Sequence, residues 1–183
     1  MSNRPHYRKA LAESGVLARL AAFDPHVAGT PPLGLDLPSS DIDILCFAPD
    51  PMRFAEAVWD AFSDCAGFAM WQWQGTDQPV IAQFRCAGWV FELFGQARPV
   101  IEQVGWRHFN IERRLLALGG QVFFAAVMAQ REAGAKTEPA FANILGFEGD
   151  PYAALLTLES LDDAALEARL QQASHAIAGS GIC

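Results

Sequence analysis

The sequence is poor in basic residues. Its 13 lysines and arginines stand against 21 aspartates and glutamates, which gives a formal net charge of −8 over 183 residues. A protein that binds long DNA or RNA needs a basic surface, so extended nucleic-acid binding is not expected. A single nucleotide is still compatible with this charge, because a local cluster or a bound metal can reverse the potential of one cleft.

Zinc-binding motifs and membrane-spanning segments are also lacking. The cysteines Cys46, Cys65, Cys86 and Cys183 have no C-x-x-C spacing and no matching histidine pairs, so we do not expect a zinc site. The amino terminus lacks the continuous apolar segment of an export signal. No apolar run is long enough to span a bilayer. We therefore expect a soluble cytoplasmic protein with free thiols.

Apolar residues make up 51% of the chain and charged residues 19%, which provides enough material for a buried core. Helical spacing and aromatic or β-branched runs both occur in the first half, whereas the second half carries helical spacing alone. We predict an α+β fold, with a core over residues 1–96 and a helical subdomain over 97–183. The predicted elements are helices over 7–22 and 50–63, a loop over 29–40, strands over 41–47, 68–74, 80–85 and 89–94, and helices over 100–118, 121–132, 139–145, 150–158 and 162–176.

Two aspartates lie at the start of the strand predicted over residues 41–47. Asp41 and Asp43 are two positions apart, so a strand directs both carboxylates to the same face. Two anions on one face repel each other, and their hard oxygen atoms favour Mg²⁺ or Mn²⁺ as the cation between them. Asp-x-Asp near a strand start is also common without a metal, so the pair alone does not define a site.

A third carboxylate, Glu92, lies among large apolar residues in the strand predicted over 89–94. An ionised carboxylate buried there is costly unless it is paired or bound to a metal. The alternative is an edge strand with one solvated face, on which Glu92 would point outward with Val90 and Phe94. That arrangement exposes two large apolar side chains to water unless a helix covers them, so the metal-site interpretation is preferred.

Gly29 and Thr30 precede Asp41 by a spacer of ten residues. A glycine at a strand end lets the backbone approach a ligand closely. The hydroxyl and N–H groups that follow can bind phosphate oxygens. A Gly-Thr pair has no predictive value by itself, and its significance comes from this spacing.

Gly29-Thr30, the spacer, Asp41-Ile42-Asp43-Ile44 and the later Glu92 resemble the signature of the nucleotidyltransferase superfamily. Thr30 departs from the usual serine or glycine, since it keeps the hydroxyl and adds a methyl group. A wider pattern resembles an uncharacterised bacterial family of this superfamily, the domain of unknown function 4269, over roughly residues 7–158. The stretches that carry this resemblance are 28–30 with 32–34, 40–43, 92–96, 107–108 with 112–113, 136–141 and 149–152.

The resemblance implies a mixed β-sheet flanked by helices, followed by a helical C-terminal half. It also implies that Asp41, Asp43 and Glu92 hold two Mg²⁺ or Mn²⁺ ions, which bind a nucleoside triphosphate and an acceptor hydroxyl. Asp41 and Asp43 would bridge the ions, and Glu92 would bind the nucleophile-side ion or accept the proton of the acceptor. The residues assigned to nucleotide binding are Gly29, Thr30, Ser40, Arg107, Arg113 and Lys136.

The cationic residues of the second half have simpler alternative roles. Glu112 can pair with Arg107 or Arg113 along a solvated helix. Lys136 can be a solvated lysine ahead of the helix start at Thr137. His108 is expected to be a structural or orienting group.

We therefore predict a metal-dependent nucleotidyltransferase that uses a nucleoside triphosphate. Its acceptor would be a small molecule, a protein side chain or an RNA end. The alternative is a non-catalytic module that binds nucleotide or metal with the same fold. A third hypothesis is an unrelated α+β protein whose carboxylates are surface features.

Overall fold

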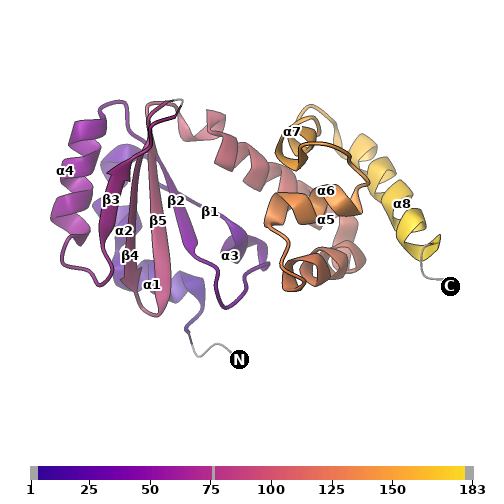
Figure 1. The fold of residues 1–183 in the computed structure, drawn as a ribbon, viewed down its shortest axis with the longest axis horizontal. Helices are drawn as coiled ribbons and strands as arrows, with labels where there is room; N and C mark the ends of the chain where they lie inside the picture. Colours follow the sequence, from indigo (N-terminus) through magenta and orange to yellow (C-terminus); the bar gives the residue numbers. More distant parts are fainter. Residues whose placement is uncertain (1–3, 76, 180–183) are drawn as a thin grey trace. The chain divides into compact units, whose positions relative to one another are not determined.

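The computed structural model describes residues 4–75 and 77–179. The chain divides into two compact units, Met1–Trp106 and Arg107–Cys183, and each unit is described by itself (Figure 1). The division between the units falls within the long helix α5 (Val104–Glu132). The boundary predicted between residues 96 and 97 lies nearer the amino terminus, where the last strand ends.

The first unit is a β-sheet with helices against it. Its strands are β1 (His26–Ala28), β2 (Ile42–Phe47), β3 (Ala69–Gln72), β4 (Val80–Cys86) and β5 (Trp89–Gln96). Its helices are α1 (Tyr7–Ser14), α2 (Val16–Arg19), α3 (Thr30–Leu33) and α4 (Pro51–Phe62), with 3₁₀ turns at Ala21–Phe23 and Val100–Glu102. The predicted strands and the predicted helix after Asp50 are confirmed.

The sheet has the strand order β1-β2-β5-β4-β3. β2 and β5 pair in parallel, whereas the other neighbouring strands pair antiparallel, so the predicted mixed sheet is confirmed. The chain leaves β2, forms α4, β3 and β4, and returns to place β5 beside β2. This return places Glu92 directly opposite Asp43 in the register.

One face of the sheet is buried against α1, α2 and α4. Alternate residues of the three central strands point to this face, because side chains of a strand alternate between its two sides. At its centre the rings of Phe62, Phe84 and Phe91 are stacked, with centroids 4.4 Å and 5.0 Å apart. The opposite face carries Asp43 and Glu92, and both are half-buried. The helices α1, α2 and α4 therefore pack on one face of the sheet, and the half-buried carboxylates lie on the other.

Two local predictions in this unit are wrong. The helix predicted over 7–22 is divided, because Gly15 has a φ of 63° and ends α1 in a left-handed cap. The loop predicted over 29–40 contains the single-turn helix α3, whose prolines occupy its first positions, where a helix needs no N–H donor. The break at Gly15 and the helix α3 each involve too few residues to change the apolar periodicity of the sequence.

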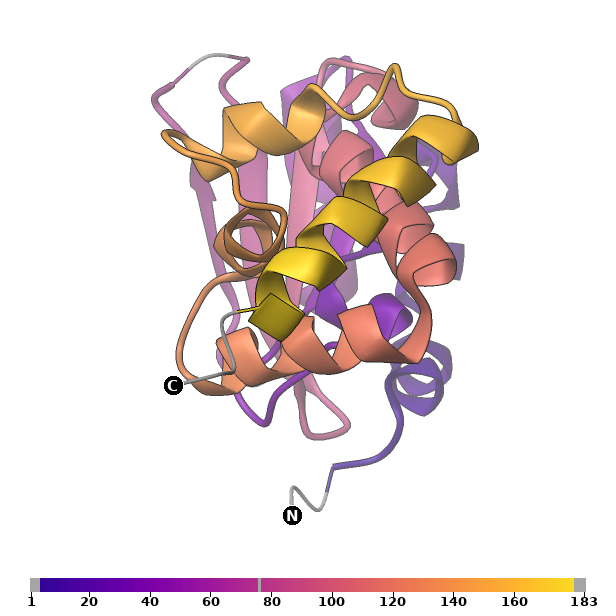
Figure 2. The same ribbon diagram turned by 90° about the vertical axis from the view of Figure 1, so that its right-hand side faces the viewer.

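The second unit is helical, as predicted. It contains most of α5, followed by α6 (Thr137–Ile144), α7 (Pro151–Leu156) and α8 (Asp163–Gly179). Gly120 has a φ of 60° and a ψ of −159°, which are not helical, so it divides α5 into two segments at the predicted Gly119-Gly120 cap. The sharp change of direction at this point is visible in Figure 2.

A buried carboxyl group lies inside this helical unit. Glu112 is 4% exposed, and its Oε1 atom has no hydrogen-bond partner among the residues that the structure describes. Burial, followed by the charge of Glu138, raises its pKa well above the ordinary value, and the charge of Arg131 opposes this shift. The prediction that Glu112 pairs with arginines along a solvated helix is therefore wrong, because this side of α5 faces the interior of the unit.

The described residues include no helix with both the length and the apolar character needed to cross a membrane. Cys46, Cys65 and Cys86 are free thiols, and Cys183 lies outside the described residues. Burial raises the pKa of Cys46 to about 12, so this thiol is chemically inert at neutral pH.

The packing around Gly95 gives a stability prediction. A Cβ atom at this position in β5 would overlap the ring of Phe54, which is fully buried on α4. Gly95→Ala should therefore lower the free energy of unfolding by about 1–3 kcal/mol in urea titrations, as overpacking of a core does. Gly105→Ala is the control, because a Cβ there meets only Leu45 at 3.6 Å. A variant G95A as stable as G105A would contradict the packing described.

The raised pKa of Glu112 predicts a pH dependence. Below the pKa of the unfolded chain, both states hold the proton on Glu112. As the pH rises above that value, the unfolded chain loses the proton first, so the stability of the fold falls until the pH passes the folded pKa. Glu112→Gln removes this titration, so its stability relative to wild type should increase from pH 4.5 to pH 7.5. The check is urea unfolding across that range, with E148Q as the control; a constant difference would exclude the raised pKa.

Candidate functional site

The carboxylate site begins with the register between the two central strands. Ala28 of β1, Asp43 of β2, Glu92 of β5 and Gln83 of β4 are successive partners in one row across the sheet. Side chains in one such row point to the same face. Two acidic side chains and one amide therefore lie next to one another on the face away from the helices.

Asp41 completes the group from the residue just before β2. The three carboxylates of Asp41, Asp43 and Glu92 each provide an oxygen atom, and these atoms all lie within 4.8 Å of one another. All three side chains are half-buried. Within the described part of the chain, this is the one group of three potential metal ligands brought together in this way. The structure thus brings together the three carboxylates that the sequence analysis selected as candidate metal ligands.

The setting of Glu92 differs from both of its sequence-based alternatives. The edge-strand alternative is wrong, because β5 lies between β2 and β4. Full burial is also wrong, since Glu92 alternates with buried residues and is itself half-buried. Desolvation, and then the negative charge of Asp41, raise the pKa of Glu92, whereas a hydrogen bond from Gln83 Nε2 to Glu92 Oε1 at 3.3 Å lowers it. Burial therefore contributes more to the raised pKa of Glu92 than the negative charge of Asp41 does.

Gly29 lies directly beneath the carboxylate of Asp43. It follows β1 and has a φ of 75°, which a residue with a side chain rarely adopts. A Cβ atom at this position would overlap the carboxylate oxygen Oδ2 of Asp43. Glycine is therefore required both by the backbone conformation and by the space that the Asp43 side chain occupies.

Thr30 and Ser40 lie at the two ends of the segment that joins Gly29 to Asp41. Thr30 is the first residue of α3, and the next two residues, Pro31 and Pro32, have no backbone N–H to offer a phosphate. The Ser40 hydroxyl accepts a hydrogen bond of 2.9 Å from the backbone N–H of Leu37. Ser40 thus closes the turn that leads directly into Asp41.

Sequence reasoning missed Arg4, which holds this same turn. Its guanidinium donates hydrogen bonds to the carbonyl oxygens of Pro38, at 3.2 Å, and Ser40, at 2.8 Å. It also pairs with Asp36 at 2.9 Å and lies 3.4 Å from the centre of the Trp89 ring. No local sequence pattern links Arg4 to a segment more than thirty positions away. Gln83 was also missed, although its alternation with buried residues of β4 indicated that face.

The predicted cationic residues belong to the second unit. Arg107 forms a bidentate pair with Glu159, with Nη2–Oε2 at 2.6 Å. This hydrogen bonding raises the pKa of Arg107 and lowers the pKa of Glu159. Arg113 is exposed and donates to Asn110 Oδ1 at 3.1 Å. Lys136 is exposed at the N-cap of α6 and makes no capping hydrogen bond with its side chain. Their assignment to nucleotide binding stays a prediction.

His108 is buried, and its Nε2 atom lies 3.0 Å from the carbonyl oxygen of Tyr152. Its Nδ1 atom lies 4.0 Å from Glu138 Oε1. Both ring nitrogens therefore face groups within the helical unit, in agreement with an orienting role. His108 and Glu112 are both buried along α5, whereas Arg107 and Arg114 pair with acidic residues.

The contacts of Arg4 predict a change in local opening. Arg4→Ala removes a charged donor from the turn over residues 36–40, so the amide of Leu37 should exchange its hydrogen at least about tenfold faster, which corresponds to a loss of ~1.4 kcal/mol. Hydrogen exchange followed by mass spectrometry or NMR would measure this rate. R8A is the control, because the Arg8 guanidinium bonds to Tyr7 and not to the turn over residues 36–40. Equal exchange in both variants would show that Arg4 does not hold the turn.

Solved structures share this fold at low sequence identity. A chain of the GLD-2/RNP-8 complex matches with a TM-score of 0.56 and 11% identity, over 86% of this chain and 68% of that chain. A cytoplasmic RNA terminal U-transferase matches with a TM-score of 0.52 and 13% identity, over 86% and 48%. The Cid1 poly(U) polymerase in its MgGTP-bound form matches with a TM-score of 0.51 and 15% identity, over 84% and 48%. The chain spans about half the length of these last two proteins.

Comparison with curated protein sequences gives no significant match. A family model described as a domain of unknown function, DUF4269, matches residues 9–158, which include the whole sheet, the three carboxylates and much of the helical unit. The chain belongs to this family, and its fold is nucleotidyltransferase-like.

Proposed function

We propose that this protein transfers a nucleotidyl group from a nucleoside triphosphate to an acceptor hydroxyl, with Asp41, Asp43 and Glu92 as its metal ligands. The observation that carries this proposal is the convergence of the three half-buried carboxylates on one face of the sheet, with their oxygens within 4.8 Å of one another. The nucleotidyltransferase-like fold supports the same reaction class, because the trio lies on the strands that build its sheet.

The chemistry of the three ligands fits a hard divalent cation. The site offers carboxylate oxygens, which suit Mg²⁺ and Mn²⁺, and no cysteine or histidine joins the group. The carboxylates also have an electrostatic reason to bind a cation, since the charge of Asp41 contributes to the raised pKa of Glu92. We propose that two ions bind here, with Asp41 and Asp43 as the shared ligands.

Each residue then has a role in the transfer. When bound, the metal supplies Lewis acidity to the triphosphate and the acceptor oxygen. The acceptor oxygen forms a bond to the α-phosphorus, the bond from the α-phosphorus to the bridging oxygen breaks, and pyrophosphate leaves with that oxygen. Glu92 binds the ion on the nucleophile side or accepts the proton of the acceptor hydroxyl. Gln83 holds the Glu92 side chain through its hydrogen bond.

The phosphate side of the proposed site is sparse in donors. Thr30 can offer its hydroxyl and its N–H, but the two prolines after it offer none. Cations are therefore needed to hold the triphosphate. We propose Arg113 and Lys136 for this role, since both are exposed, together with Arg107, whose Nε–Nη2 edge is paired with Glu159.

The proposed acceptor is a small molecule, a protein side chain or an RNA end. A net charge of −8 disfavours a long nucleic acid, because its phosphates would meet a negative surface. The solved structures named above include enzymes that act on RNA ends, but at identities of 11–15% their likeness extends to the fold alone.

The first test is binding. Magnesium or manganese together with a nucleoside triphosphate should raise the melting temperature of the wild type, because a ligand that binds only the folded state stabilises it. Asp43→Asn should lose this response. Asp64→Asn is the matched control, since Asp64 is an exposed carboxylate of the same unit outside the trio. The proposal fails if no triphosphate stabilises the wild type with either metal.

The second test is turnover. Each α-³²P-labelled triphosphate would be incubated with the protein, the metal and a cell extract fractionated into small molecules, proteins and RNA. We expect labelled acceptor and pyrophosphate with the wild type and D64N, and at least a hundredfold less with D43N. Nucleotide binding without labelled product in any fraction would instead support a non-catalytic binding module.

A further inference from the structure

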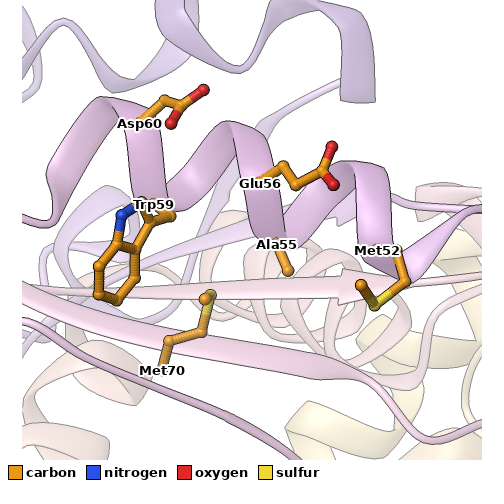
Figure 3. Close-up of a pocket in the computed structure, with 6 residues that line it drawn as sticks. All are labelled: Met52, Ala55, Glu56, Trp59, Asp60 and Met70. Atoms are coloured by element: carbon orange, nitrogen blue, oxygen red, sulfur yellow. The ribbon is translucent and has the colours of Figure 1, made fainter.

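A groove lies at the β3 edge of the sheet, on the face opposite the carboxylates. This open groove of about 440 Å³ is bordered by helix α4 and strand β3 (Figure 3). Its lining residues are Met52, Ala55, Glu56, Trp59, Asp60 and Met70. Trp59 and Met52 are 56% and 69% exposed, which is unusual for side chains of this size and polarity.

One wall of the groove is an edge strand. β3 pairs with β4 and is the last strand in the sheet order. In an antiparallel pair, alternate residues point their N–H and C=O groups away from the partner strand, so the outer side of β3 presents backbone donors and acceptors. Such an edge can accept another strand, with the backbone providing the affinity.

The other wall is an apolar side of α4. Figure 3 shows Trp59, Ala55 and Met52 spaced along the helix above the strand that carries Met70. The Trp59 ring is held edge-on against Phe68, with centroids 5.7 Å apart and an interplanar angle of 83°. A strand added to β3 would place alternate side chains into this apolar groove. On the opposite face of the sheet it would meet Trp71, which is 40% exposed.

The rim of the groove is acidic. Glu56 and Asp60 project from the exposed side of α4, one turn apart, and neither forms an ion pair with any residue that the structure describes. Arg53 lies within one turn of Glu56 but is outside the lining of the groove. Together with the negative charge of the whole chain, this rim favours a cationic ligand.

We propose that this groove binds an extended, basic segment of a partner protein, which adds a strand to the edge of β3. The added strand places apolar side chains between α4 and Met70, and a lysine or arginine beside Glu56 and Asp60. Pairing of β3 with the β3 of a second copy is disfavoured, since Ala69–Gln72 has no basic residue and would bring a second acidic α4 to the groove. The proposal is independent of the nucleotidyl-transfer proposal.

The test is a selection from a displayed library of random octapeptides on the full chain, with counter-selection on Trp59→Ala. We expect enriched peptides in which lysine or arginine alternates with apolar residues. Their binding would be measured by fluorescence anisotropy. Trp59→Ala and the double variant E56Q/D60N should each weaken binding at least about tenfold, which corresponds to ~1.4 kcal/mol. N-methylation of alternate peptide amides should weaken it as much, because it removes the backbone hydrogen bonds.

Two controls distinguish peptide binding in the groove from nonspecific electrostatic binding and from binding at the carboxylate site. The variant E132Q/E148Q removes two exposed acidic groups elsewhere and should leave peptide binding unchanged. D43N should also leave it unchanged. Failure to enrich any peptide over the Trp59→Ala counter-selection overturns the proposal, as does binding that tolerates N-methylation. Self-association of the wild type that Trp59→Ala abolishes overturns it too, because the occupant is then a second copy.

Discussion

The close approach of three carboxylates is the main electrostatic constraint on the centre of the sheet. The parallel pairing of β2 with β5 places Asp43 opposite Glu92, and Asp41 adds a third charge within the same few ångströms. The other face of the same strands packs into a dense apolar core. Burial of this core stabilises the fold and offsets the electrostatic cost of placing three carboxylates together. Supporting residues also contribute: Gln83 bonds to Glu92, and Gly29 leaves space for Asp43.

The sequence indicated the strands, the main helices and the carboxylate trio for physical reasons that act over short distances. The two-residue spacing of Asp41 and Asp43 fixes their common face, and the alternation around Glu92 fixes its side of the strand. The Gly119-Gly120 pair likewise marked the break in α5. The family resemblance indicated that Gly29 belongs to the same site as the two aspartates. The structure supplies a physical reason, since a side chain at Gly29 would collide with Asp43.

What the sequence did not indicate depends on contacts between distant segments. Arg4 stabilises the turn before Asp41 through carbonyl groups, which any residue provides, so no side-chain pattern marks the turn as its partner. Glu112 has the same helical spacing whether α5 faces water or the interior, and only the packing of the second unit shows that it is buried. Strand order is a third case. The strands β3, β4 and β5 form an antiparallel meander, but only the structure shows that β5 also pairs with β2, which places Glu92 in the centre of the sheet.

The long connection between β2 and β5 also has a kinetic consequence. Asp43 and Glu92 become neighbours only after about fifty residues of intervening chain have been brought together, and parallel pairings of such high sequence separation are slow to form. The antiparallel hairpin of β4 and β5 is local and can form earlier. Glu92 would then be in place on a hairpin before the aspartates arrive, and the docking of β2 would be the step that brings the charges together. Acidic groups at this site would therefore slow the final docking of β2, and divalent cations in the refolding buffer would accelerate it on the proposal that the three carboxylates bind them.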